Sequence, residues 1–227
     1  MYKRVLLLIG FCFIFLSTSS VFAGGFPNLG GLTGGGKSQG GVSTSDLSSS
    51  KTNAVTAYLA STQELTQSLE KAGEAFGVKK EVLEKLAVVN SLKEGNINSN
   101  ELDKARKASE EASQIIKQKM DETKTPSVES KKLMAESMVH LASGIQKETE
   151  LVGTVQNLSS QAQGAVSSAS PMEIMKVKDI ASTALTLVKA IPNDLGLTKN
   201  ILSSYIQYAK ANNIEIPGNA TGLLKGE

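Results

Sequence analysis

Cysteine, histidine and aromatic residues are scarce in this chain. Its 227 residues include one cysteine, one histidine and no tryptophan, and aromatic residues make up 4% of the total. Cys12 lies in a leading segment that we expect to be removed, so no thiolate remains for a nucleophile, a disulfide or a zinc site. The single histidine, His140, cannot supply a histidine-rich metal centre or a di-iron bundle. We therefore predict no bound metal and no cofactor.

Positive charge is scarce as well. Removal of residues 1–23 takes away Lys3 and Arg4 and leaves 22 basic against 22 acidic residues. The remainder is neutral and holds one arginine, Arg106, with five aromatic residues. Proteins that bind nucleic acids need basic residues to neutralise phosphates and aromatic rings to stack on bases, so we expect no nucleic-acid partner.

The amino terminus has the features of a cleaved export signal. A basic start at Met1–Arg4 precedes an apolar run from Val5 to Leu16, and Val21-Phe22-Ala23 forms a small-x-small cleavage site. The apolar run is too short to cross a membrane comfortably as a lasting anchor. We predict a signal peptide over residues 1–23 and an exported bacterial protein, in the periplasm or outside the cell. An uncleaved membrane anchor is the alternative.

Glycine and serine dominate the next segment. Residues 24–51 hold nine glycines followed by a Ser/Thr cluster, and few apolar groups could offset the entropy of ordering them. We predict a disordered linker there. Lys37 follows three glycines in a way that superficially resembles a phosphate-binding loop, but such a loop needs a buried strand before it and a helix directly after it.

The remaining residues have helical periodicity. Apolar residues recur at steps of three and four, and no alternating strand pattern interrupts them. We predict a bundle domain over residues 52–213 and an extended or disordered tail over 214–227. The expected fold is all-α: an elongated antiparallel bundle of five to six helices with one very long helix. The predicted helices span 53–76, 79–94, 98–120, 126–170, 170–191 and 194–211.

The longest predicted helix follows Pro126. Its apolar stripe is close to a heptad repeat, which favours lengthwise packing as in a coiled coil. Gly144, Gly153 and Gly164 mark either close approaches of a neighbour or bends. If neighbouring helices do not cover the stripe, the segment 126–169 becomes a surface for self-association. The helix from Met172 to Ile191 has only a narrow polar strip, so we expect it to be the most buried.

Several residues are candidates for a site, each beside a structural alternative. His140 and Glu136 are one helical turn apart, a spacing that could serve a metal site or a proton switch. An exposed His–Glu pair on one helix is the simpler interpretation. The pairs Met134/Met138 and Met172/Met175 could hold Cu(I), although methionines at helical spacing usually pack in a core.

Two further features have simple interpretations. The basic residues Lys104, Arg106 and Lys107 alternate with acids, which is typical of a solvated helix face. Asn157 and Asn219 each begin a glycosylation-type sequence, which matters only in a eukaryotic secretory pathway.

This inventory favours binding over catalysis. We expect no catalytic residues and predict an exported, non-enzymatic helical bundle that binds a protein or a component of the cell envelope, with no transmembrane span in the mature chain. The alternative is a carrier of a small apolar ligand in a cavity lined by Met138, Met175, Leu185 and Tyr205. A helical, toxin-like secreted protein is a weaker alternative.

Overall fold

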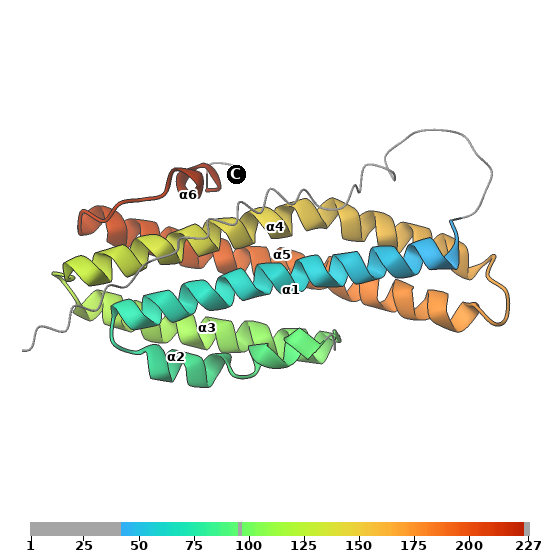
Figure 1. Ribbon diagram of the computed structural model, residues 1–227, viewed down its shortest axis with the longest axis horizontal. Coiled ribbons are helices and arrows are strands. Elements are labelled where there is room, and N and C mark those ends of the chain that lie inside the picture. Colours follow the sequence, from blue (N-terminus) through green and yellow to red (C-terminus); the bar gives the residue numbers. More distant parts are fainter. Residues whose placement is uncertain (1–41, 95–96, 225–227) are drawn as a thin grey trace, which may run out of the picture. The chain divides into compact units, whose positions relative to one another are not determined.

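The computed structural model describes residues 42–94 and 97–224, and their regular structure is entirely helical (Figure 1). The predicted signal peptide and residues 24–41 of the predicted linker lie outside the described residues. The helices in chain order are α1 (Thr44–Ala75), α2 (Lys79–Leu86), the 3-10 helix η2 (Val89–Glu94), α3 (Ser99–Glu122), α4 (Val128–Val166), α5 (Ile174–Ala211) and α6 (Gly218–Gly222). The prediction of an all-α bundle is confirmed.

Helix α4 is the centre of the packing. It lies lengthwise against both α1 and α5 and runs antiparallel to each of them (Figure 1). Helices α2 and α3 pack on each other, and α3 contacts both α1 and α5. The apolar faces of these helices form one continuous core, whose fully buried members include Leu69, Leu86, Ile116, Leu141 and Leu187.

Helix α1 begins eight residues before the predicted start of the bundle domain. Ser43 caps it by accepting a hydrogen bond from the Asp46 amide at 3.1 Å, and Leu47 is fully buried. Thr44 also donates a hydrogen bond to Glu173 at the start of α5, at 2.8 Å. The prediction that the disordered linker extends to residue 51 is therefore wrong, because one buried leucine and one cap extend the helix into the Ser/Thr cluster.

Helix ends in the first half follow the predicted local signals. Gly77 has φ of 71°, a left-handed conformation that glycine adopts readily, and α1 ends just before it. Asn98 caps α3 by accepting from the Glu101 amide at 3.1 Å. The predicted helix over 79–94 divides into α2 and η2, and Leu83, which its spacing places inward, is 40% exposed.

Helix α4 begins two residues after the predicted proline start. Ser127 is its cap and accepts from the Ser130 amide at 3.1 Å. With 39 residues, α4 is about 58 Å long. Glu148 and Ser159, which interrupt its apolar stripe in sequence, are themselves buried and continue the same face.

Helix α5 continues through Pro192, where the sequence predicts two separate helices. A proline inside a helix removes one backbone hydrogen bond and costs about 3 kcal/mol. Pro192 is exposed, and the Asn193 side chain donates a hydrogen bond to the Lys189 carbonyl at 3.2 Å. Buried residues on both sides, among them Ile191 and Ile201, hold the two halves in one helix.

Two further predictions about the last third of the chain are wrong. The segment from Met172 to Ile191 is not the most buried, because Met172 is 90% and Met175 is 72% exposed. The tail is not wholly extended: α6 packs on α4 with Ala220 fully buried, and Ile214 is also buried.

The three glycines of α4 have different surroundings. A Cβ atom added at Gly144 would lie 3.3 Å from the Glu64 Cβ and 3.4 Å from the Ser61 carbonyl oxygen, both on α1. Nothing lies within 4 Å of such an atom at Gly153 or Gly164. Gly144 therefore marks a close approach of α1 and α4, whereas the other two have no packing reason within the described residues.

No helix of the described part of the chain combines the length and the apolar character needed to cross a membrane.

Candidate functional site

His140 does not pair with Glu136. Its Nδ1 lies 2.7 Å from Glu64 Oε2 across the α1–α4 interface, while Glu136 accepts a hydrogen bond from Lys71 at 2.8 Å. Lys147 binds the other oxygen of Glu64. The antiparallel pairing of α1 with α4 thus replaces the predicted contact along one helix with contacts between two helices.

Glu64 carries the charge of this network. Burial alone would raise its pKa, but the hydrogen bonds from His140 and Lys147 outweigh that effect and lower the pKa to about 2. Glu64 is therefore ionised throughout the physiological range. Its contacts with His140 and Lys147 join α1 to α4 near the surface, which is a structural role.

The two methionine pairs differ in burial. Met134 and Met138 are fully buried in the core, and Met172 and Met175 project into solvent. The cavity proposed for the carrier alternative needs Met138, Met175, Leu185 and Tyr205 to converge. Met175 and Leu185 are exposed while the other two are packed in the core, so these four residues do not line one space.

The other predicted features lie at the surface. Lys104 and Lys107 are exposed, and Arg106 pairs with Asp103 at 2.7 Å, as expected for a solvated helix face. Asn157 and Asn219 are exposed. In residues 42–94 and 97–224, no group of three or more histidine or acidic residues could hold a metal ion.

The glycine-rich segment contains two familiar patterns. Residues 31–38 match the phosphate-loop pattern Gly-x-x-x-x-Gly-Lys-Ser, and residues 36–40 match the hydrolase pattern Gly-x-Ser-x-Gly. Both lie outside the described residues. Each pattern acts at the junction of a strand with a helix, whereas the described part of the chain has no strand and α1 starts only at Thr44. A segment this rich in glycine and serine matches such patterns by composition.

A buried polar cluster, which the sequence alone did not suggest, joins α1, α4 and α5. Tyr58 donates a hydrogen bond of 2.7 Å to Asp194, and Ser61 lies 3.4 Å from Glu148 Oε1. Glu148 is 3% and Asp194 is 9% exposed. Glu148 Oε2 has no hydrogen-bond partner among the described residues. Unpartnered buried carboxylate oxygens are rare in folded proteins, because they lose their hydration without compensation.

The environment of this cluster favours protonated acids. Burial and the negative charge of Asp194 raise the pKa of Glu148 to about 8, and the long hydrogen bond from Ser61 opposes this shift only weakly. Burial raises the pKa of Asp194 to about 6, although the Tyr58 hydrogen bond and the charge of Arg106 oppose the shift. Glu148 is therefore largely neutral at pH 7.

Asp194 also reaches a small surface pocket between α3 and α5. The pocket encloses about 170 Å³, and Asp103, Arg106 and Lys189 line it beside Asp194. Through this pocket the buried cluster meets solvent at one member, while Glu148 stays enclosed.

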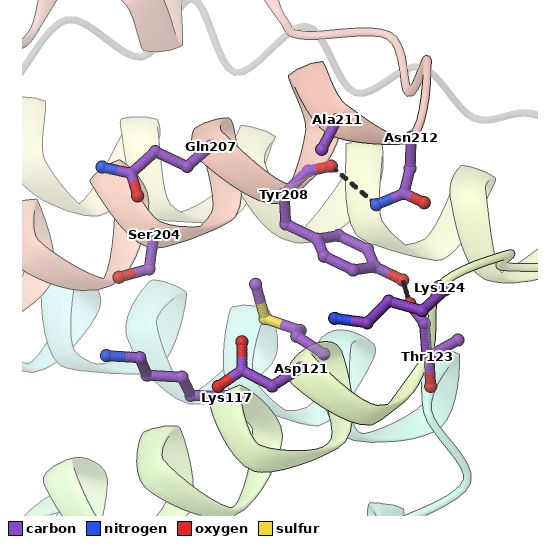
Figure 2. A pocket seen from close by; sticks show the side chains of 10 residues that line it. Lys117, Asp121, Thr123, Lys124, Ser204, Gln207, Tyr208, Ala211 and Asn212 are labelled. Carbon is purple, nitrogen blue, oxygen red and sulfur yellow. Dashed lines mark hydrogen bonds between the residues drawn. The ribbon is translucent and has the colours of Figure 1, made fainter.

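A larger pocket of about 400 Å³ lies between the ends of α3 and α5 (Figure 2). The Tyr208 hydroxyl donates to the Thr123 carbonyl at 2.9 Å, and its ring meets the Phe76 ring edge-on with centroids 5.4 Å apart. The side chains of Lys117 and Lys124 also line this pocket (Figure 2). The pocket is open and polar, unlike the apolar cavity of the carrier alternative.

The end of the domain where α4 turns into α5 exposes apolar side chains. Met172 and Met175 are 90% and 72% exposed. The acids beside them are engaged within the protein: Ser170 and Thr44 donate to Glu173, and Lys51 binds Asp179. We call Met172 and Met175, together with Val42 (40% exposed) just before α1, the methionine end.

Comparisons with protein-family models, with curated proteins and with solved structures found no match to this chain.

Proposed function

We propose that this chain is an exported, non-enzymatic binding protein, and that its methionine end contacts a partner protein or a component of the cell envelope. The observation that carries the proposal is the exposure of Met172 and Met175, three residues apart. Methionine is flexible and polarisable, and clusters of it suit adaptable binding surfaces.

Two features support binding over catalysis. The acids whose pKa values are raised most, Glu148 and Asp194, are almost wholly buried, so a substrate has little access to them. Met172, just before α5, and Met175, in the first turn of α5, are accessible instead, at one end of the bundle. Thr44 of α1 is hydrogen-bonded to Glu173 there, so α1 begins next to the exposed methionines.

Export rests on the sequence of residues 1–23 and is tested first. We expect the chain recovered from the periplasm or the medium to begin at Gly24, because the basic start, the apolar run and Val21-Phe22-Ala23 form a complete cleavage signal. Intact-mass measurement of the native protein decides this. A product that still carries Met1 would contradict cleavage, and a chain found only in the cytoplasm would contradict export.

Binding is tested by affinity capture of the tagged chain from its native envelope fraction, with the wild type beside a Met172→Gln/Met175→Gln variant. We expect the wild type to retain a specific partner and the variant to lose most of it, because burying each methionine contributes about 1.5–3 kcal/mol. Val128→Thr is the matched control, since Val128 is 86% exposed at the start of α4, away from the methionine end (Figure 1).

Equal capture of a partner by the wild type and the methionine variant would show that the binding surface lies outside the methionine end. Loss of capture by the Val128 control would show a non-specific effect of lowered surface hydrophobicity. Both variants change exposed side chains, so their circular dichroism spectra should match that of the wild type.

A further inference from the structure

The core of the bundle holds two buried acids, Glu148 and Asp194, and the charge of Asp194 acts on Glu148. Glu148 of α4 faces α1 through Ser61 and Tyr58, and it faces α5 through Asp194. Asp194 in turn accepts the hydrogen bond of Tyr58. The two carboxyl groups therefore share one buried polar cluster, where the charge of Asp194 disfavours ionisation of Glu148.

Little positive charge balances this pair. On the α3 side, Arg106 and Asp103 act on Asp194 with opposite signs, and these two are paired with each other at the surface. Lys189 of α5 lines the small pocket beside Asp194, on the solvent side of the cluster. Within α4 itself, Lys147 is next to Glu148 in sequence but binds Glu64 instead.

Glu148 has almost no capacity to hold a charge in this setting. One carboxyl oxygen has a single long contact with Ser61, and the other has no partner among the described residues. A neutral carboxylic acid tolerates this setting far better than a carboxylate, which needs several donors.

The packing nearby also limits local adjustment. Gly144 is one helical turn before Glu148, and there the α4 backbone lies against Ser61 and Glu64 of α1. Dense packing of this kind responds to a new buried charge by opening to water, because side chains have little room to rearrange.

We propose that Glu148 and Asp194 form a proton-binding pair, and that loss of the proton from Glu148 loosens the packing of α1 and α5 around the middle of α4. The bundle thereby acquires a sensitivity to external pH that its neutral composition would not suggest.

The sign of the effect follows from the pKa values. The pKa of Glu148 is raised from 4.5 to about 8, and that of Asp194 from 3.8 to about 6. At pH values between the unfolded-state pKa and the folded-state pKa, the folded protein keeps protons that the unfolded chain has released. The free energy of unfolding therefore falls as pH rises. Glu64 acts in the opposite direction, but with its pKa lowered to about 2 its contribution changes only below about pH 4.5.

The experiment is thermal unfolding of the full exported chain from pH 5.5 to pH 8.5, followed by circular dichroism. We expect the midpoint to fall by roughly 5 °C or more across this range, since a tenfold difference in proton affinity between the folded and unfolded states corresponds to a few degrees for a domain of this size. Glu148→Gln should remove most of this dependence of the unfolding midpoint on pH, which we call the slope. It should also raise the midpoint at pH 8.5, because the amide is a neutral isostere of the acid.

Two controls assign the slope to Glu148. Glu150→Gln changes an exposed acid two residues further along α4 and should keep the wild-type slope. His140→Gln is the second control and should also keep the wild-type slope, because His140 contacts Glu64 and not Glu148. A flat wild-type profile, or an unchanged slope in Glu148→Gln, would overturn the proposal.

A second measurement does not depend on any variant folding. Carbon-detected NMR titration of the wild-type carboxyl groups should show Glu148 changing protonation near pH 8, and amide exchange corrected for pH should accelerate around residues 145–151 and 191–198 over the same range. A Glu148 midpoint near the ordinary glutamate value, or exchange that does not follow the titration, would refute the proton-binding pair.

Discussion

Replacing Val155 with aspartate is expected to lower the free energy of unfolding by about 3–5 kcal/mol, because it leaves an uncompensated charge in the core. Val155 is 1% exposed and lies on the α4 face that the other helices cover. Urea unfolding followed by circular dichroism measures the change. Val139→Asp is the matched control on the same helix: Val139 is 45% exposed, so its replacement should change stability little.

The same variant tests whether α4 is an assembly surface. Helices α1 and α5 have 32 and 38 residues and pack along α4, so one chain covers most of the apolar stripe, and neither two short helices laid end to end nor a second copy is needed. Unchanged stability in Val155→Asp, together with loss of a dimer in light scattering, would contradict this intramolecular packing. Self-association through 126–169 would then be the better interpretation.

Replacing Gly144 with valine is expected to destabilise the domain by about 1–3 kcal/mol through overpacking. The first added carbon would already lie 3.3 Å from the Glu64 Cβ, and the two methyl groups of valine would push against the α1 backbone at Ser61. Gly153→Val is the control: nothing lies within 4 Å there, and valine has a somewhat better helix propensity than glycine. Chemical denaturation of both variants provides the comparison.

Equal effects at Gly144 and Gly153 would contradict a specific close approach of α1 and α4. A stable Gly144→Val variant would instead show that the two helices can separate at this level at little cost. In that case the core around Glu148 would also have more room to rearrange locally.

The parts of the fold that could be predicted from sequence are those governed by local chemistry. The Asn98 cap and the glycine stop at Gly77 each depend on residues within one helical turn, and the structure confirms both. The buried stripe of α4 follows equally from its periodicity, with Met134, Met138 and Leu141 inward.

The boundaries that were missed depend on distant contacts. Ser43 starts a helix because Leu47 reaches the core and Thr44 reaches Glu173, neither of which a Ser/Thr-rich run reveals. Pro192 does not end α5 because it is exposed to solvent while Ile191 before it and Asp194 after it stay buried, so tertiary packing outweighs the local cost.

The buried acids could not be predicted either. In sequence, Glu148 interrupts an apolar stripe, and Asp194 has the position of the first residue of a short helix after Pro192. Their meeting depends on the pairing of α1, α4 and α5, which brings Tyr58 to Asp194 across 136 positions of the chain. The signal that was available was the position of Glu148 itself, because an acid at a core position of a heptad-like stripe has to find a neutralising arrangement.

The pairing of the first helix with the last two long ones also constrains the order of folding. Contacts such as Thr44 with Glu173 and Tyr58 with Asp194 span 129 and 136 positions, so α1 can pair with α4 earlier but completes its contacts only when α5 is available. For an exported protein, as proposed above, this topology leaves the core incomplete until α5 is available. Docking of the last long helix therefore completes the domain.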